Sequence, residues 1–305
     1  MQKNISVIYV TGGTGFVGSE LTKQWIAKSK QNRVIVQTRC PEQYNDSESV
    51  KYVRCYKDVA AEHVDAVINL AGAPIADKRW SAKRKSLLCE SRVALSESLV
   101  EDMALSPPKV VVSASAIGFY GLGDSAVDEL DSVGEGFASD LCKSWEQAIA
   151  PAAEYSRLVV FRLGVVLGDG GMMAKLLPLY RLGLGGPVGK GNQWLSWIHI
   201  DDVIEAILQA VGESGQDGTQ LKGTYNLTSP EPVQQKLFAK TLGNVLGRPA
   251  FVPTPAFVFL TVFGEMGREL LLGGQRVLPN RLLETGYQFS HPDLKKALTK
   301  ILRVI

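Results

Sequence analysis

The sequence predicts an α/β protein of the Rossmann type: a doubly wound parallel sheet with a smaller, mostly helical C-terminal substrate lobe. Three observations support this prediction. A glycine-rich turn at residues 12–18 follows the first apolar run, apolar runs then alternate with helical patterns, and the alternation stops after residue 168. Continuous apolar runs are typical of parallel strands that helices cover on both faces. A chain of 305 residues is long enough for such a domain and an appendage.

The first half of the chain predicts the sheet, element by element. Short apolar runs predict strands at residues 5–10, 33–37, 50–55, 65–70, 109–113 and 157–162. Helical spacing of Val17, Leu21 and Trp25 predicts the first helix, and further helices are expected at residues 81–103 and 139–154. Residues 1–168 therefore form the expected dinucleotide-binding domain, and later segments are expected to return to its sheet.

Residues 169–305 predict mainly the substrate lobe. One helix is entered through residues 199–202, another covers residues 233–246, and Pro292 with Asp293 starts a C-terminal helix. The apolar run at residues 256–264 is about half the length that a bilayer-spanning helix needs. We expect it to be a packed helix.

Composition limits the classes of function. The 33 basic and 31 acidic residues are interspersed, so no nucleic-acid stripe or polybasic membrane anchor is predicted. The four cysteines lack metal-site spacing and fit reduced thiols, and the N-terminus lacks the pattern of a secretory signal. We expect a cytoplasmic protein with a small-molecule substrate, without a metal site and without a nucleic-acid or membrane partner. The oligomeric state stays open.

The glycine-rich turn predicts a dinucleotide site because it stands between a strand and a helix. Gly12 permits the tight turn, Gly15 lets the backbone approach a pyrophosphate, and Gly18 permits close helix packing. Amide groups at the helix N-terminus attract the anion. The turn residues that we expect to bind the cofactor are Gly12, Thr14, Gly15, Phe16, Val17 and Gly18.

The end of the second strand favours NADP(H). Arg39 stands about where an NAD enzyme places an acid on the ribose 2′-hydroxyl, and its guanidinium suits a 2′-phosphate. The alternative is a solvated arginine at a strand end. Leu70, Ala71 and Gly72 close the fourth strand with mostly small residues that leave room for the cofactor.

Several motifs resemble the extended short-chain dehydrogenase/reductase family, and more closely an atypical branch that resembles NAD(P)-dependent sugar epimerases. They include Ser-Ala-Ser-Ala-Ile-Gly-Phe-Tyr-Gly at 113–121, Arg-Leu-Gly-Val-Val-Leu-Gly at 162–168 and Leu-Gly-Leu-Gly-Gly-Pro at 182–187. Trp-Ile-His-Ile-Asp-Asp at 197–202, Gly-Gln-Arg-Val-Leu-Pro at 274–279 and Thr-Gly-Tyr-Gln-Phe at 285–289 extend the likeness. Members of this branch are often labelled sugar epimerases or cell-division-inhibitor homologues.

The resemblance implies a Tyr-x-x-x-Lys pair for proton transfer, and here the tyrosine is missing. Lys143 matches the lysine that holds the nicotinamide ribose, and Ser139 stands at the usual tyrosine position. A serine hydroxyl is a much weaker acid than a phenol. Ser115 is a catalytic candidate to hydrogen-bond the substrate, while Ser113 is a cofactor candidate that is also not excluded from catalysis.

Other side chains keep alternative interpretations. Tyr120 supplies a phenol if its loop turns inward, although packing is the commoner role, and Asp140 is either a base or a solvated residue that compensates the helix dipole. A capping or buried role for His199 is commoner than an acid–base one. The glycine-rich loop at 183–191, with Trp194, either lines a substrate pocket or links the lobes.

These patterns leave two functions open. The first is an NADP(H)-dependent epimerase or oxidoreductase that acts on a small hydroxylated or carbonyl substrate, with a nucleotide sugar as one option. The second is an NADP(H)-binding regulator or redox sensor with little or no catalysis, which the absent tyrosine favours. Substrate, direction of redox and any role in cell division do not follow from the sequence.

Overall fold

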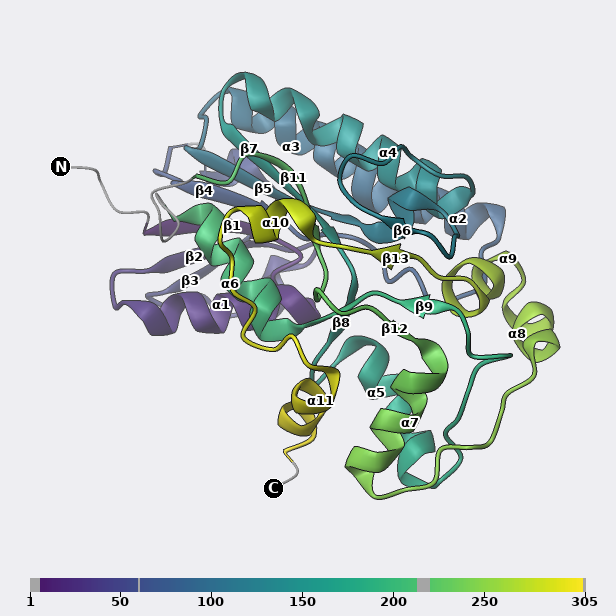
Figure 1. Cartoon of the computed structure of the whole chain (residues 1–305). Coiled ribbons are helices and arrows are strands. Elements are labelled where there is room, and N and C mark those ends of the chain that lie inside the picture. The colour runs from purple at the N-terminus through teal and green to yellow at the C-terminus, as the bar shows by residue number, and fades with distance from the viewer. Residues whose placement is uncertain (1–5, 60, 213–219, 304–305) are drawn as a thin grey trace.

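A seven-stranded parallel sheet forms the centre of the chain in the computed structural model, which describes residues 6–59, 61–212 and 220–303 (Figure 1). The strand order is β11-β7-β5-β4-β1-β2-β3, and every neighbouring pair is parallel. The strands are β1 (Val7–Thr11), β2 (Arg33–Gln37), β3 (Val50–Val53), β4 (Ala66–Asn69), β5 (Val110–Ala116), β7 (Arg157–Leu163) and β11 (Gly223–Leu227). The predicted fold class is confirmed; Ile5, which we assigned to the first strand, lies outside the described residues.

Helices cover both faces of the sheet. Apolar side chains of α1 and α6 pack on one face with Ile8 and Val10, and those of α3 and α4 pack on the other with Tyr9 and Val111. The bounds are α1 (Phe16–Lys28), α3 (Leu95–Ala104), α4 (Phe137–Ile149) and α6 (Ile200–Val211). Short 3₁₀ turns occupy Pro41–Gln43, Tyr56–Val59, Ile117–Tyr120 and Ala150–Glu154.

The helix predicted at residues 81–103 is interrupted. It begins with α2 (Ala82–Cys89), where the Ser81 hydroxyl accepts from the Arg84 amide as an N-cap, and it ends with α3. Between them lies a π-helical segment, Glu90–Ala94. The apolar spacing alone does not reveal this change of helical pitch.

A smaller lobe packs below the sheet around α5 (Gly171–Arg181), α7 (Gln235–Leu246) and α11 (Leu294–Leu302). The Asp293 carboxylate accepts from the Lys296 amide, which confirms the predicted start of the last helix. Three two-stranded sheets pair β8 (Val165–Leu167) with β10 (Trp197–His199), β9 (Trp194–Leu195) with β12 (Val233–Gln234), and β6 (Ala126–Val127) with β13 (Arg276–Val277). The domain boundary at residue 168 stays a prediction.

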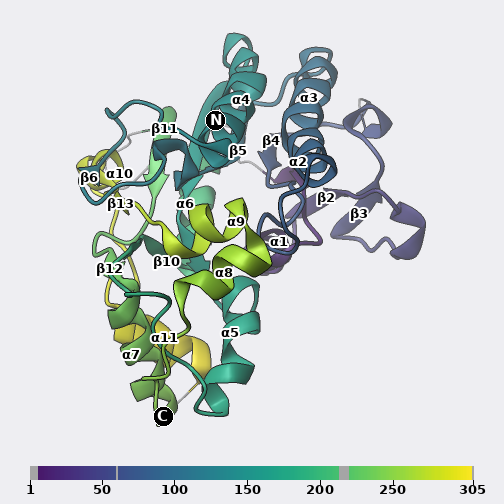
Figure 2. The ribbon, with the colours of Figure 1, turned by 90° about the vertical axis from the view of Figure 1, so that its right-hand side faces the viewer.

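The apolar run at 256–264 differs from our expectation. It forms α8 (Ala256–Phe263), yet none of its residues is buried, and Phe257 is 67% exposed. Figure 2 shows α8 and α9 (Glu265–Gly267) between α2 and α5. Along the chain, a π-helical segment, Arg268–Leu272, and α10 (Asn280–Glu284) follow α9. The predicted helix is present but only partly packed, because Phe263 lies against a buried cluster that includes Trp80 and Met266. In the part of the chain that the structure describes, no helix has the length and apolarity that a membrane span needs.

Candidate cofactor and substrate site

The glycine-rich turn connects β1 to α1 and leaves its outer side open. Gly12 has φ +69°, and the Gly15 amide donates to the Gly12 carbonyl at 2.9 Å. A Cβ on Gly18 would lie 2.3 Å from the Gly12 carbonyl oxygen, so the helix requires glycine there. Thr14 and Gly15 are exposed, and no side chain caps α1. The free amide groups at this helix start suit a phosphate anion.

Phe16 and Val17, both half-buried, follow the turn. The Phe16 ring packs against the loop after β8, because a Cβ on Gly168 or Gly170 would lie 2.8 or 2.6 Å from it. This contact joins the start of α1 to the smaller lobe. Phe16 therefore anchors the start of α1 against the loop after β8.

Arg39, two residues after β2, is exposed. Its guanidinium forms no hydrogen bond or ion pair with the residues that the structure describes. By contrast, the exposed Arg54 after β3 pairs with Glu42 at 3.2 Å. Arg39 is free to bind a ligand.

The end of β4 is held by a buried hydroxyl. The Thr11 hydroxyl donates to the Asn69 side chain at 2.7 Å and accepts from the backbone amides of Leu70 and Ala71 at 3.1 Å. Leu70 and Ala71 are half-buried and Gly72 is exposed. The loop 70–72 thus keeps a fixed position beside the turn.

The two predicted serines of β5 point into the protein. Asn69 donates to the hydroxyl of Ser113 at 3.3 Å, and the Ser115 hydroxyl donates to Glu146 of α4 at 2.7 Å. Both serines are at most 1% exposed. Their roles at the cofactor and in catalysis stay predictions.

A buried ion pair ties β7 to α4. The Arg162 guanidinium donates twice to the Glu146 carboxylate, both at 2.8 Å, and lies 3.4 Å from the centre of the Phe119 ring. It also donates to the Tyr120 hydroxyl at 2.9 Å, which donates to Asn226 of β11 at 2.7 Å. Burial raises the pKa of Tyr120, and Arg162 opposes that shift. Tyr120 therefore joins strands and does not face an open cleft.

Ser139 and Lys143 lie about one turn apart on α4, but only Ser139 is buried. The Ser139 hydroxyl is fully buried and lies 2.9 Å from the Gly118 carbonyl oxygen and 3.1 Å from that of Glu135, one of which takes its proton. Lys143 is exposed and forms no hydrogen bond or ion pair with any described residue. Burial raises the pKa of the Cys142 thiol to about 11, so this thiol stays protonated. The structure does not bring Ser115, Ser139 and Lys143 into one open constellation.

Comparison with known proteins agrees with this geometry. The model of the NAD dependent epimerase/dehydratase family matches residues 8–227, from β1 to β11. The chain belongs to this family. A domain of unknown function, DUF1731, matches residues 254–301.

Relatives of this epimerase/dehydratase-family chain match over nearly all its length. The Arabidopsis thaliana "Epimerase family protein SDR39U1 homolog, chloroplastic" is 35% identical over 312 residues, which are 97% of this chain and 86% of the relative. The crystal structure of human SDR39U1 (isoform2) with NADPH matches with a TM-score of 0.86 and 34% identity, over 98% of this chain and 100% of that one. A nucleoside-diphosphate sugar epimerase from Corynebacterium glutamicum matches with a TM-score of 0.76 and 28% identity, over 97% and 58% of the two chains.

The DUF1731 region of this epimerase-family chain supports α4 directly. The Glu269 carboxylate accepts from the Ala138 amide at 3.1 Å, in the first turn of α4, and Lys85 of α2 pairs with Glu265 at 2.6 Å. An acid at a helix start compensates the helix dipole. Sequence reasoning missed Glu269 because it lies 131 residues from its partner.

His199 agrees with the capping interpretation. Its side chain is 2% exposed, its Nδ1 accepts from the Asp201 amide at 3.1 Å, and burial lowers its pKa to about 4. His199, Asp201 and His291 offer ligand atoms within 4.8 Å of one another, a cluster that our expectation of no metal site did not consider. The Lys300 ammonium already donates to Asp201 at 2.6 Å and to His291 at 3.0 Å.

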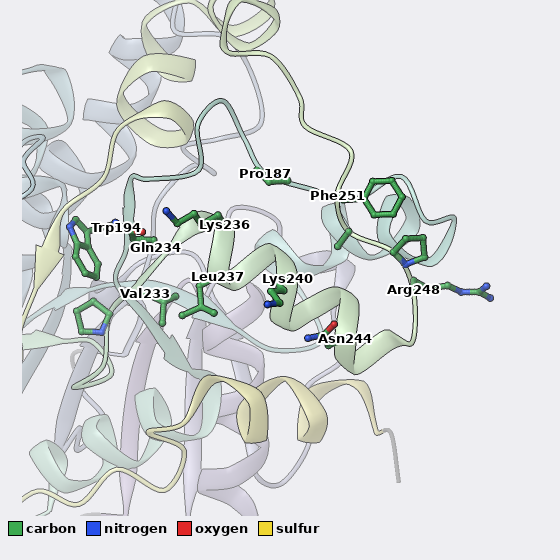
Figure 3. Close-up of a pocket in the computed structure, with 13 residues that line it drawn as sticks. Pro187, Trp194, Val233, Gln234, Lys236, Leu237, Lys240, Asn244, Arg248 and Phe251 are labelled. Carbon is green, nitrogen blue, oxygen red and sulfur yellow. The ribbon is translucent and has the colours of Figure 1, made fainter.

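A pocket of about 1040 Å³ lies in the smaller lobe of this epimerase-family chain, beside α7 (Figure 3). Trp194 stands at one end and Phe251 at the other. Its charged lining residues are Lys236, Lys240 and Arg248, with no acid among them. The loop before Trp194 thus contributes to a pocket, and this pocket suits an anionic ligand.

Proposed function

We propose that this chain binds NADP(H) and acts as an epimerase- or oxidoreductase-type enzyme on a small hydroxylated or carbonyl substrate. The open glycine turn, with the unpaired Arg39 beside it, carries the proposal. The family match and the NADPH in the human SDR39U1 crystal support it. The chain's own residues fit the cofactor because Gly12 packs against the loop after β4 and Gly18 packs α1 against the turn, at distances that a Cβ would prevent.

Each part of the turn has a role in this proposal. The free amides at the start of α1 bind the pyrophosphate, and Arg39 binds the 2′-phosphate in a bidentate manner. Leu70, Ala71 and Gly72 form the wall beside the cofactor. Lys143 is our candidate for the ribose hydroxyls, since its ammonium is exposed and unpaired among the described residues.

The chemistry that NADPH supplies when bound is hydride transfer: a carbonyl carbon takes the hydride, its oxygen takes a proton, and NADP⁺ remains. An epimerase runs such a transfer in both directions and leaves the cofactor unchanged. Ser115 stays our candidate for the substrate hydroxyl or carbonyl, although its hydroxyl donates to Glu146 in the structure.

The substrate class includes nucleotide sugars as one possibility. The basic pocket beside α7 supports an anionic substrate, and a relative that is 28% identical carries the name nucleoside-diphosphate sugar epimerase. A cytoplasmic location also remains our proposal, supported by four cysteines that are free thiols. No residue of the site bears on cell division, so that label stays outside the proposal.

One observation favours a second function, an NADP(H)-binding regulator or redox sensor. Ser139 occupies the usual tyrosine position, and its hydroxyl is buried against backbone carbonyls. Such a protein still binds the cofactor, but it lacks an accessible proton donor for catalytic turnover of a substrate. Binding and turnover therefore need separate measurements.

Titration of the pure protein with NADPH and NADH tests the cofactor. Arg39→Asp should weaken NADPH about 100-fold, because it removes charge-assisted hydrogen bonds and repels the 2′-phosphate, while NADH changes little. Arg181→Asp, at the exposed end of α5, makes the same charge change and should leave both affinities alone. Equal losses of NADPH and NADH in Arg39→Asp would refute the role of Arg39.

Decay of NADPH fluorescence with a carbonyl panel, and product analysis with a nucleotide-sugar panel, test turnover. Substrate-dependent decay or epimer formation supports the enzyme. Tight NADPH binding without either supports the regulator. Absence of NADPH binding would overturn both.

A further inference from the structure

A second cationic group lies beside the loop that follows β4. Arg92 is in the π-helical segment Glu90–Ala94. Single π turns within α-helices are uncommon and often mark functional sites, because they change the direction of one side chain. Here the segment places the guanidinium against the loop at Gly72 and Ala73.

The Arg92 guanidinium has no acidic partner among the described residues. Nη2 donates to the Ala73 carbonyl at 3.0 Å, and Nη1 has two longer contacts of 3.4 Å, to the Leu88 carbonyl and the Ser91 hydroxyl. Its carbon lies 5.2 Å from the centre of the Trp145 ring. Carbonyls, a hydroxyl and an aromatic ring are thus the contacts of this half-buried cation. Burial of a cation without a counter-ion costs free energy.

Arg84 adds a second guanidinium to the same loop. It donates to the Pro74 carbonyl, and no described residue forms an ion pair with it. The two guanidinium groups contact neighbouring residues of one loop, Arg84 at Pro74 and Arg92 at Ala73. Burial lowers the pKa of Arg92, and the charge of Arg84 lowers it further. Two buried donors here lack partners within the described residues: the Arg84 Nε–H and the Trp145 indole N–H.

The position of this pair is next to the cofactor turn. A Cβ on Gly72 would lie 2.8 Å from the Arg92 guanidinium carbon, and a Cβ on Gly12 would lie 2.8 Å from the carbonyl of Leu70. The loop thus touches the turn at residue 70 and Arg92 at residue 72. Arg92 thus contacts the loop that we expect to line the cofactor, without being part of the phosphate turn.

We propose that Arg92, supported by Arg84, binds an oxyanion of the substrate, a carboxylate or a phosphate, beside the cofactor. This inference rests on the proposed function. The planar guanidinium suits a bidentate contact with either group, and the Arg92 Nε–H has no hydrogen bond to a described residue.

The experiment uses the full chain saturated with NADPH and calorimetric titration of two probes, oxalate and inorganic phosphate. Wild type should bind at least one of them saturably. Arg92→Gln should weaken that probe about tenfold or more, the effect of losing a charge-assisted contact. Arg79→Gln is the matched control, since Arg79 is exposed and donates to the Thr261 carbonyl.

Arg84→Gln is the second variant, and it keeps the inference testable if Arg92→Gln does not fold. It should weaken the same probe while the NADPH affinity stays within about twofold. Tighter oxalate binding identifies a carboxylate substrate, and tighter phosphate binding identifies a phosphorylated one. Both results support the inference.

Three results would overturn it: no saturable binding of either probe to wild type, equal weakening in Arg79→Gln, or a loss of NADPH affinity in Arg92→Gln. The last result would assign the arginine to the cofactor. Failure of the proposed function gives a different result, because wild type then does not bind NADPH. In that case oxyanion binding is measured on the apoprotein.

Discussion

Replacing Glu146 by Ala should destabilise the protein strongly. Arg162 is 6% exposed, and Glu146 accepts two of its hydrogen bonds at 2.8 Å. The variant leaves the guanidinium with the Tyr120 hydroxyl and an aromatic ring, and it leaves the Ser115 hydroxyl without its acceptor. Breaking one side of a buried ion pair removes about 3–5 kcal/mol from the free energy of unfolding. Native domains have about 5–15 kcal/mol, so a folded but weakened protein is expected.

Urea unfolding followed by far-UV circular dichroism measures this loss, with the slope against urea compared between variants. Glu42→Ala is the matched control, because the Glu42–Arg54 pair is 3.2 Å long and its side chains are 62% and 64% exposed. An exposed pair contributes about 0–1 kcal/mol.

The double replacement Glu146→Leu with Arg162→Met separates pairing from packing. It removes both charges together, so its loss should be smaller than that of Glu146→Ala. A loss below about 1 kcal/mol in Glu146→Ala, equal to that of the exposed control, would show that the ion pair does not hold α4 to β7.

Two further predictions concern the turn and the smaller lobe. Gly18→Ala should lower the NADPH affinity more than about tenfold, because its Cβ would meet the Gly12 carbonyl oxygen at 2.3 Å, whereas Gly123→Ala, with nothing within 4 Å, should not. Unchanged NADPH titrations of Gly18→Ala would show that the turn does not hold the cofactor. Burial lowers the pKa of His199 from 6.5 to about 4 in the folded protein. As the pH falls, this imidazole is therefore protonated in the unfolded chain before it is protonated in the folded protein, and the free energy of unfolding should decrease between about pH 6.5 and pH 4. His199→Asn keeps an N-cap and should flatten that slope in urea midpoints; an unchanged slope would assign it to other groups.

The sheet was predictable because its signals are local. Strands buried on both faces read as continuous apolar runs, and β2 has the predicted bounds. The turn was predictable for the same reason, since all its glycines lie within seven residues. The run at 256–264 shows the limit: apolarity predicts a helix but not whether another element covers it.

The candidate catalytic residues were harder to place because their surroundings depend on distant contacts. Ser115 lies 31 residues from Glu146, and Tyr120 lies 106 residues from Asn226. No helical or strand periodicity in the sequence predicts that residues so far apart form a hydrogen bond. The sequence around a serine at the end of a strand therefore does not distinguish a hydroxyl that is open to a substrate from one that donates to a buried carboxylate.

The position of α4 connects the two halves of the proposed site. Glu146 and Arg162 attach its C-terminal part to the sheet, and Glu269 of the DUF1731 region accepts from its first turn. The buried Trp145 ring of this helix packs against the Arg92 guanidinium. A C-terminal region that fixes α4 thus also fixes the surface under Arg92. Changes in that region should alter oxyanion binding before they alter NADPH binding, because its residues Glu265 and Glu269 contact α2 and α4, whereas the cofactor turn joins β1 to α1.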